Sequence, residues 1–258
     1  MQPVRIILSG CSGKMGRAIT ELAQARQDIK IAAGIDKFPS SCTYPVFPNF
    51  TQLNTDGDVI IDFSRPDILS SLLEYAVKNN MPAVLATTGY NEEQLKEIKQ
   101  ASERIPLFMS GNMSLGVNLM INLLKTATKI LKDTFDIEII EKHHNQKVDA
   151  PSGTALMMAD AINNSAGGNM QYIYDRHPLS QKRGKEELGI HSVRGGTIVG
   201  EHTVIFAGAD ECLEITHRAQ SRGIFAAGAL SAAKFLINKA PGIYNMDDLI
   251  SDSANTKC

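Results

Sequence analysis

The chain has few of the features that mark disulfide-rich or membrane proteins. Its cysteines, Cys11, Cys42, Cys212 and Cys258, are widely scattered and include no CxxC pair. This pattern favours reduced thiols in the cytoplasm over a disulfide framework. No apolar run approaches the roughly 20 residues that a membrane-crossing helix needs, and the first apolar run is too short for a signal peptide. We therefore expect a cytoplasmic protein that does not bind a membrane.

The chain also lacks an excess of charge of one sign. Its 26 lysines and arginines nearly balance its 28 aspartates and glutamates, for a formal net charge of −2. Proteins that bind nucleic acid usually carry a basic excess, so we expect no nucleic-acid partner. Hydrophobic residues make up 43% and charged residues 21%, which is typical of a globular protein. Against this background the cationic segment 142–147 stands out.

The first half of the chain alternates strand and helix patterns. Short apolar runs typical of buried strands lie at residues 4–8, 29–35, 58–63, 83–86 and 106–109. Helical patterns separate them, among them one from about residue 67 to 78 and one over 91–103. Because crossovers between parallel strands are right-handed, this order predicts an α/β domain with a parallel sheet.

The pattern changes beyond residue 113. Helices are expected at 118–131, 154–163 and 225–238, and strands at 136–141, 190–193, 197–206 and 211–219. Polar or glycine-bearing loops are expected at 164–169 and 179–187. These strands predict an antiparallel or mixed sheet, and we find no internal repeat.

A glycine-rich turn follows the first strand. Gly10, Gly13 and Gly16 form a GxxGxxG turn before a helix, where backbone N–H groups can meet a phosphate. Asp36 lies 20 residues beyond Gly16, at the end of the second strand, where a carboxylate can bind the hydroxyls of an adenosine ribose. The sequence therefore predicts a dinucleotide site, and the alternative is a turn that serves packing alone.

Two residues near this turn leave alternatives open. Asp36 would repel a 2′-phosphate and favour NADH, whereas Lys37 would attract that phosphate or simply be solvated. Cys11 inside the turn is either a reactive thiol or a small residue that fits, and we favour the second interpretation.

A second polar segment predicts chemistry. His143, His144 and Lys147 lie in a stretch too polar for a core, and crowded cations cost free energy unless an anion meets them. Adjacent side chains on an extended segment face opposite ways, and no carboxylate or cysteine lies at a standard zinc spacing, so we expect no metal. The alternative for His144 is a structural or exposed histidine.

The same segment leads into a helix. Ser152 is a candidate N-cap, so that the N–H groups of Gly153 and Thr154 face a bound carboxylate. The alternative is capping alone, but the cations just upstream favour a bound anion.

These motifs together are similar to those of one known family. The string from Glu141 to Ala155 resembles the 4-hydroxy-tetrahydrodipicolinate (dihydrodipicolinate) reductases of lysine and diaminopimelate biosynthesis. The resemblance spans nearly the whole chain and includes Gly10–Arg17, Thr87-Thr88-Gly89, and residues 112–118, 198–204, 213–219 and 221–222. The family usually has glycine where this chain has Ala86.

The resemblance implies a set of site residues. Cofactor contacts are expected at Gly10, Cys11, Ser12, Gly13, Lys14, Met15, Asp36, Lys37, Ala86, Thr87, Thr88, Ser110, Gly111, Asn112 and Met113. His143 and Lys147 would handle the proton, and His144, Gly153 and Thr154 would bind a substrate carboxylate. Which of His143 and Lys147 delivers the proton stays open.

The resemblance also implies an organisation and an activity. It implies a Rossmann-like dinucleotide-binding domain over 1–113, to which 223–258 returns, and an α+β domain over 114–222 that binds substrate and forms a homotetramer. The activity would be reduction of (2S,4S)-4-hydroxy-2,3,4,5-tetrahydrodipicolinate, a dicarboxylate, by NADH or NADPH. One rival is a semialdehyde dehydrogenase, which needs a nucleophilic cysteine, and Cys212 is a poor candidate. The other rival is a non-catalytic NAD(H) sensor.

Overall fold

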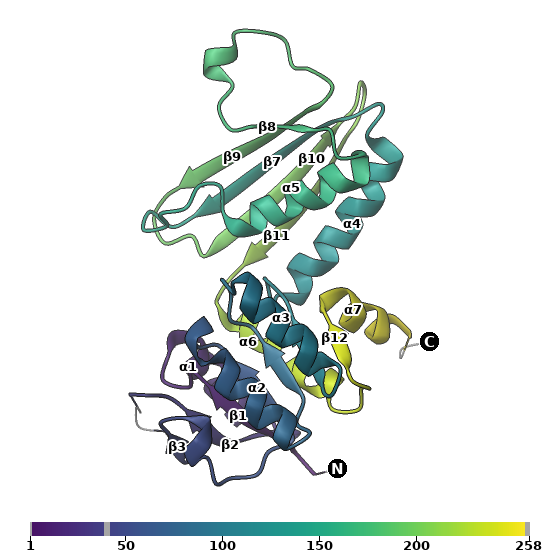
Figure 1. The fold of residues 1–258 in the computed structure, drawn as a ribbon. Coiled ribbons are helices and arrows are strands. Elements are labelled where there is room, and N and C mark those ends of the chain that lie inside the picture. Colours follow the sequence, from purple (N-terminus) through teal and green to yellow (C-terminus); the bar gives the residue numbers. More distant parts are fainter. Residues whose placement is uncertain (1, 39–41, 256–258) are drawn as a thin grey trace. The chain divides into compact units, whose positions relative to one another are not determined.

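A computed structural model describes residues 2–38 and 42–255 (Figure 1). The chain divides into two compact units, one of Met1–Leu115 with Arg222–Cys258 and one of Gly116–Ser221. These limits lie within two residues of the expected boundaries at 113 and 223. The binding roles expected for the two units stay predictions.

Unit 1 contains a sheet of seven parallel strands. In the sheet they follow the order β12-β6-β5-β4-β1-β2-β3. Their bounds are β1 Val4–Ser9, β2 Ile29–Ile35, β3 Val46–Phe47, β4 Val59–Asp62, β5 Ala83–Leu85, β6 Pro106–Met109 and β12 Gly242–Tyr244. The five expected strands are confirmed. The sequence missed β3 and β12, because two or three residues are too few to show a strand pattern.

Helices cover both faces of this sheet (Figure 1). They are α1 (Lys14–Gln24), α2 (Leu69–Lys78), α3 (Glu92–Ser102), α6 (Gly223–Leu236) and α7 (Met246–Asn255), with single turns η1 (Phe50–Gln52) and η2 (Pro66–Ile68). Successive strand residues point to opposite faces. Ile6 and Leu8 therefore pack with α1 and α6, while Ile7 packs with α2 and α3. This two-sided burial explains why the central residues of these strands are apolar on both faces.

Unit 2 is built on a mixed sheet, as expected. Its strands are β7 (Asp136–His143), β8 (Gln171–Ile173), β9 (Glu187–Arg194), β10 (Gly200–Ala207) and β11 (Cys212–Ala219), in the order β11-β10-β7-β9-β8. β7, β8 and β9 run parallel, whereas β10 is antiparallel to both β7 and β11.

Some predicted limits in unit 2 are wrong. Strand β10 begins at Gly200 rather than at residue 197, and β8 was not predicted. The residues before β10 belong to a turn whose backbone hydrogen-bonds the loop after β7, since Asn145 donates to the carbonyl of Gly196 at 3.2 Å. Residues 164–166, expected in a loop, continue helix α5 until Gly167, which has a φ of 115°.

Two helices and the sheet form the core of unit 2. Helices α4 (Leu115–Leu131) and α5 (Gly153–Ala166) pack on one face of the sheet, and a short turn η3 spans His177–Leu179. Their buried side chains are Val117, Met120, Ile121 and Leu124 from α4 and Ala155, Met158, Ala159 and Ile162 from α5. They pack with Ile137 and Ile139 of β7, so the first half of β7 is held from this side.

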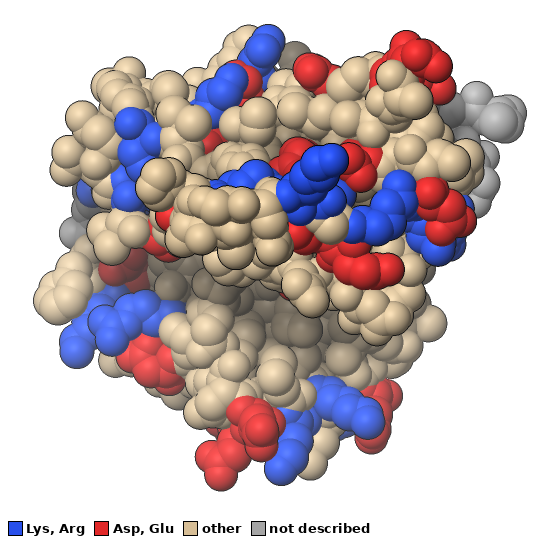
Figure 2. Space-filling view, turned by 90° about the horizontal axis from the view of Figure 1, so that it is seen from above, with Lys and Arg blue, Asp and Glu red and all other residues tan. Residues whose placement is uncertain are grey.

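Surface charge is mixed in sign. On the face drawn in Figure 2, lysine and arginine side chains lie beside aspartate and glutamate side chains. Within residues 2–38 and 42–255, no helix combines the length and apolar character that a membrane span requires.

Candidate functional site

The glycine turn of unit 1 joins β1 to α1. Gly10 has a φ of 75°, and a Cβ there would lie 2.5 Å from the carbonyl oxygen of Phe63. A Cβ at Gly16 would lie 2.5 Å from the carbonyl oxygen of Cys11. Larger residues at these two positions would force the backbone apart, so the turn depends on glycine.

The start of α1 fits a phosphate group. Gly13 is its N-cap, no described side chain caps it, and its first turn holds no acidic residue. The positive end of the helix dipole therefore faces solvent, an arrangement that favours an anion.

Asp36 lies beside this turn, as a ribose-binding carboxylate requires. Its carboxylate accepts the N–H of Ser12 at 2.9 Å and the N–H of Phe38 at 3.0 Å. Lys37 is exposed, and its Nζ lies 5.9 Å from the centre of the Phe38 ring. The residues present thus fit a dinucleotide.

Cys11 is packed into this turn. Only 1% of it is exposed, and burial raises the pKa of its thiol to about 12. The thiol is therefore protonated at neutral pH, which supports the interpretation of a small residue that fits. The described cysteines Cys11, Cys42 and Cys212 form no disulfide, and Cys258 lies outside the described residues.

The residues expected beside the nicotinamide follow β5 and β6. Because parallel strands end at one edge of a sheet, residues 86–88 and 110–113 lie on the same edge as the glycine turn. Thr87 donates its hydroxyl to Asp62 at 2.6 Å, and Ser64 donates to the other carboxylate oxygen at 2.5 Å. Only 1% of Asp62 is exposed, and burial raises its pKa. The sequence did not single out this buried carboxylate.

Two further observations concern this edge. Among the described residues, the non-glycine residues with positive φ are Asn80 and Ser180, so the backbone at Ala86 does not require glycine. In the turn after β6, the hydroxyl of Ser110 donates to the carbonyl of Asn112 at 2.8 Å, and the side chain of Asn112 accepts the N–H of Ser114 at 2.9 Å. These bonds fix the shape of the turn.

In unit 2, successive side chains of β7 point to opposite faces of the sheet. Glu141 and His143 therefore both point to the face on which α4 and α5 pack. Glu141 is 0% exposed and His143 is 9% exposed. The carboxylate of Glu141 lies 2.6 Å from Nδ1 of His143 and accepts two N–H bonds from Arg194, each of 2.7 Å. It also accepts the N–H of Ser152 at 3.1 Å. Burial raises the pKa of Glu141, but the bonds from Arg194 and His143 outweigh it and bring the pKa to about 2.

A second histidine, His202 on β10, lies next to this pair. Its ring centre is 5.2 Å from that of His143, edge to face, and its Nε2 hydrogen-bonds the hydroxyl of Ser152 at 3.0 Å. Burial, and then the charge of His143, lower the pKa of His202 to about 4. His202 is therefore neutral at physiological pH.

The loop after β7 carries the other predicted residues. Nδ1 of His144 is buried, and no described residue hydrogen-bonds it. Lys147 pairs with Asp149 at 2.9 Å and lowers the pKa of that carboxyl. Lys142 instead pairs with Glu201 at 2.6 Å, so it does not join this group.

The predicted N-cap of α5 is confirmed. The hydroxyl of Ser152 accepts the N–H of Ala155 at 3.2 Å, and the helix begins at Gly153. A Cβ at Gly153 would meet no described atom within 4 Å. The helix start therefore leaves open space beside Gly153, where a ligand can approach.

The structure brings Glu141, Arg194 and His202 together with His143 and the start of α5, and the sequence alone indicated a role for none of these three residues. Glu141 could have been found, because strand alternation puts it on the same face as His143. Arg194 and His202 come from β9 and β10 and carry no local signal. They meet Glu141 and His143 only through pairing of these strands with β7.

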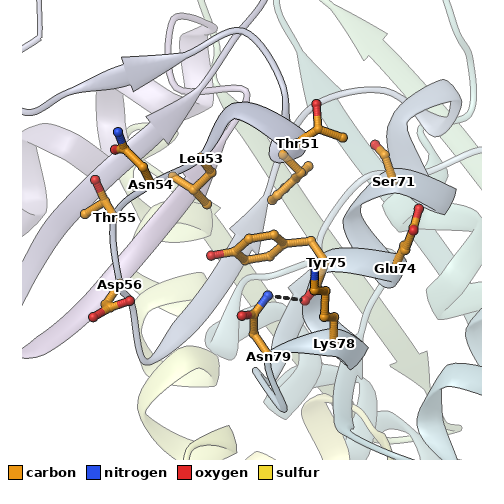
Figure 3. A pocket seen from close by; sticks show the side chains of 11 residues that line it. Thr51, Leu53, Asn54, Thr55, Asp56, Ser71, Glu74, Tyr75, Lys78 and Asn79 are labelled. Carbon is orange, nitrogen blue, oxygen red and sulfur yellow. Dashed lines mark hydrogen bonds between the residues drawn. The ribbon is translucent and has the colours of Figure 1, made fainter.

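Within the described part of the chain, no three histidine, cysteine or carboxylate side chains are grouped to hold a metal. A cavity of about 450 Å³ lies in unit 1 (Figure 3), and its lining residues are Phe50, Thr51, Leu53, Asn54, Thr55, Asp56, Ser71, Glu74, Tyr75, Lys78 and Asn79. It contains none of the predicted site residues.

Comparison with known proteins decides the family. The family model for the N-terminus of dihydrodipicolinate reductase matches residues 4–113, and the model for its C-terminus matches residues 116–250. The chain belongs to the dihydrodipicolinate reductase family. The expected resemblance is thereby confirmed.

Relatives match over nearly their full length. The chain is 50% identical over 247 residues to 4-hydroxy-tetrahydrodipicolinate reductase of Caldanaerobacter subterraneus subsp. tengcongensis, covering 96% of this chain and 98% of that one. It is 52% identical over 249 residues to the Clostridium tetani reductase, covering 96% and 97%. Among solved structures, dipicolinate-bound dihydrodipicolinate reductase from Paenisporosarcina sp. TG-14 matches with a TM-score of 0.81 and 25% identity, covering 94% and 97%.

Proposed function

We propose that this protein reduces (2S,4S)-4-hydroxy-2,3,4,5-tetrahydrodipicolinate to tetrahydrodipicolinate in lysine and diaminopimelate biosynthesis. Its relatives of 50% identity and more carry the name of this activity. The observation that carries the proposal is the buried Glu141–His143 pair beside the open start of α5. This arrangement supplies a proton and an anion site within one unit.

The substrate carboxylates bind at the loop after β7 and at the start of α5. The N–H groups of Gly153 and Thr154 lie at the positive end of a helix of 14 residues. His144 adds a buried ring nitrogen that no described group satisfies. The dipicolinate bound to the Paenisporosarcina reductase is a planar dicarboxylate, which supports this assignment.

The reaction needs a hydride, a proton and the loss of water. When bound, the reduced nicotinamide supplies the hydride. The 4-hydroxyl group leaves as water together with a hydrogen from the adjacent ring carbon, which forms a conjugated ring imine. After the hydride has reached this imine, His143 supplies the proton that neutralises the negative charge left on the ring. Such proton transfer contributes about 10²–10⁴-fold to rate. Lys147, released from Asp149, stabilises the developing negative charge.

The electron donor is a nicotinamide cofactor, held at the glycine turn of unit 1. We assign NADH as the better donor, because the carboxylate of Asp36 lies beside the turn and would repel a 2′-phosphate. Lys37 weakens this preference, since its exposed ammonium can reach a phosphate, and NADPH should also react.

Assembly and location are proposed with the family. Unit 2 would form the contacts of a cytoplasmic homotetramer. Exposed apolar side chains of unit 2 support such contacts, among them Leu119, Leu123, Val193 and Leu213.

A coupled assay tests the activity. Pyruvate and aspartate semialdehyde are converted by the preceding synthase, and loss of absorbance is followed with NADH and with NADPH. We expect turnover with both nucleotides, faster with NADH, and inhibition by pyridine-2,6-dicarboxylate in competition with substrate. The matched control is His143→Gln, which should bind NADH normally. No turnover by the unmodified protein with either nucleotide would refute the proposed reaction.

A further inference from the structure

The carboxylate of Glu141 is saturated by donors. Arg194 contacts both of its oxygens, Ser152 donates its N–H to one of them, and Nδ1 of His143 lies 2.6 Å from the other. An ionised carboxylate can only accept hydrogen bonds. The ring nitrogen that faces it must therefore carry a hydrogen.

The surroundings hold this arrangement in place. Arg194 lies opposite His143 in the register of β7 and β9, and it also donates to the carbonyl of Asp149 at 2.7 Å. Glu141 is fully buried, so water does not compete for its oxygens. Loss of the negative charge of Glu141 would leave the guanidinium of Arg194 without its ion-pair partner, and this costs free energy in a buried site.

The other ring nitrogen of His143 is the one left for chemistry. Nε2 faces the backbone of Gly200, where a Cβ would lie 3.1 Å away, and the His143 side chain keeps 11% of its surface exposed. The neighbouring His202 contacts the edge of the ring and is engaged by Ser152. Glu141 therefore restrains the ring of His143, and the N-cap residue Ser152 restrains the ring of His202.

We propose that Glu141, held by Arg194, is a positioning residue that keeps a hydrogen on Nδ1 of His143 and so makes Nε2 the atom that moves the proton. Before the reaction, Nε2 of the neutral Nδ1–H ring takes a proton from solvent. In the reaction the new Nε2–H bond breaks, the proton bonds to the reduced ring, and the neutral imidazole that remains keeps its hydrogen on Nδ1, facing Glu141. This inference rests on the proposed function of His143, but the tautomer itself can be measured without turnover.

The experiment uses the full chain labelled with ¹⁵N-histidine. Two-bond ¹H–¹⁵N correlation spectra report which ring nitrogen carries the hydrogen, and His143→Gln identifies the signal. We expect the Nδ1–H form in the unmodified protein. In Glu141→Gln an amide N–H replaces one acceptor oxygen, so the Nε2–H form should grow. The kcat should fall by about 10²-fold or more, while the KM for substrate and the Kd for NADH stay within about twofold.

Two further variants separate positioning from folding. Glu141→Asp keeps a charge for Arg194 but is one methylene too short for His143, so it should also lose the tautomer and kcat. Glu138 provides a matched control on the same strand, because its carboxylate likewise contacts an arginine, Arg183 at 2.9 Å, and a histidine, His191 at 2.9 Å. Glu138→Gln should leave the His143 signal and kcat unchanged.

The outcomes that overturn the inference are distinct from failure of the reaction. A neutral His143 ring with its hydrogen on Nε2 and none on Nδ1 in the unmodified protein overturns it even if neither Glu141 variant folds. Folded variants with an unchanged tautomer or unchanged kcat also overturn it, as does a rise in KM without a fall in kcat. If the unmodified protein shows the Nδ1–H form but no reductase turnover, the proposed function fails and the positioning role of Glu141 stands.

Discussion

His202 should make the protein sensitive to mild acid. Its folded-state pKa is about 4, against 6.5 in an unfolded chain. Between these pH values His202 binds a proton in the unfolded chain but not in the folded chain. The free energy of unfolding therefore falls as the pH falls. The stabilisation is complete above pH 6.5 and is lost towards pH 4.

The size of the effect follows from the two pKa values. At about 1.36 kcal/mol per pH unit, the difference between 6.5 and about 4 corresponds to about 3 kcal/mol. His202 is only 4% exposed, so solvent screens little of this. Carboxyls with lowered pKa values, such as Glu141 and Asp149, act in the same direction but only below about pH 4.5.

The assay compares the protein with His202→Gln, which keeps an acceptor for Ser152 but cannot ionise. Urea unfolding of both, followed by circular dichroism from pH 7.5 to 4, gives the difference in unfolding free energy. In this difference, the contributions of titrating groups that both proteins share cancel. One of them is His217, because burial also lowers its pKa. We expect it to change by about 3 kcal/mol across the range. A constant difference, or a His202 ring signal that titrates near pH 6.5 in NMR spectra, would refute the reasoning.

Three other substitutions test the remaining site residues. Gly16→Ala places a methyl against the carbonyl of Cys11, and calorimetric titration should show NADH binding weakened about fivefold or more, since overpacking costs about 1–3 kcal/mol. Asp36→Ala removes the carboxylate beside the glycine turn and should raise kcat/KM for NADPH relative to NADH; an unchanged ratio would mean that Asp36 does not contact the ribose. Lys147→Ala should lower kcat by about 10²-fold, measured in the coupled assay, with NADH affinity as the control. Normal turnover of this variant would exclude Lys147 from the reaction.

The parallel domain could be predicted because its signals are local. Apolar runs such as residues 59–61 are buried on both faces and leave a continuous pattern in the sequence. The glycine turn and Asp36 are likewise set by the order of strand, turn and helix. The short strands β3 and β12 could not be predicted, since their pairing with longer neighbours, rather than their own residues, makes them strands.

The site in unit 2 was predicted only in part. The segment from His143 to Thr154 is contiguous, so its histidines, lysine and helix cap could be identified together. Arg194 and His202 lie 51 and 59 residues beyond His143 in the chain. Their roles depend on the sheet order β10-β7-β9, which strand patterns alone do not determine.

The return of the chain to unit 1 bears on how the protein is made. Helix α6 seals one face of the parallel sheet against Ile6 and Leu8, and β12 pairs with β6 at its edge. Both come from residues 222–258, which leave the ribosome after residues 116–221. During synthesis, the sheet of unit 1 therefore keeps one apolar face exposed until α6 has been made. Residues 116–221, which form the whole of unit 2, can fold before that. A stop codon near residue 221 should thus leave unit 2 able to fold, whereas unit 1 should bind chaperones or aggregate.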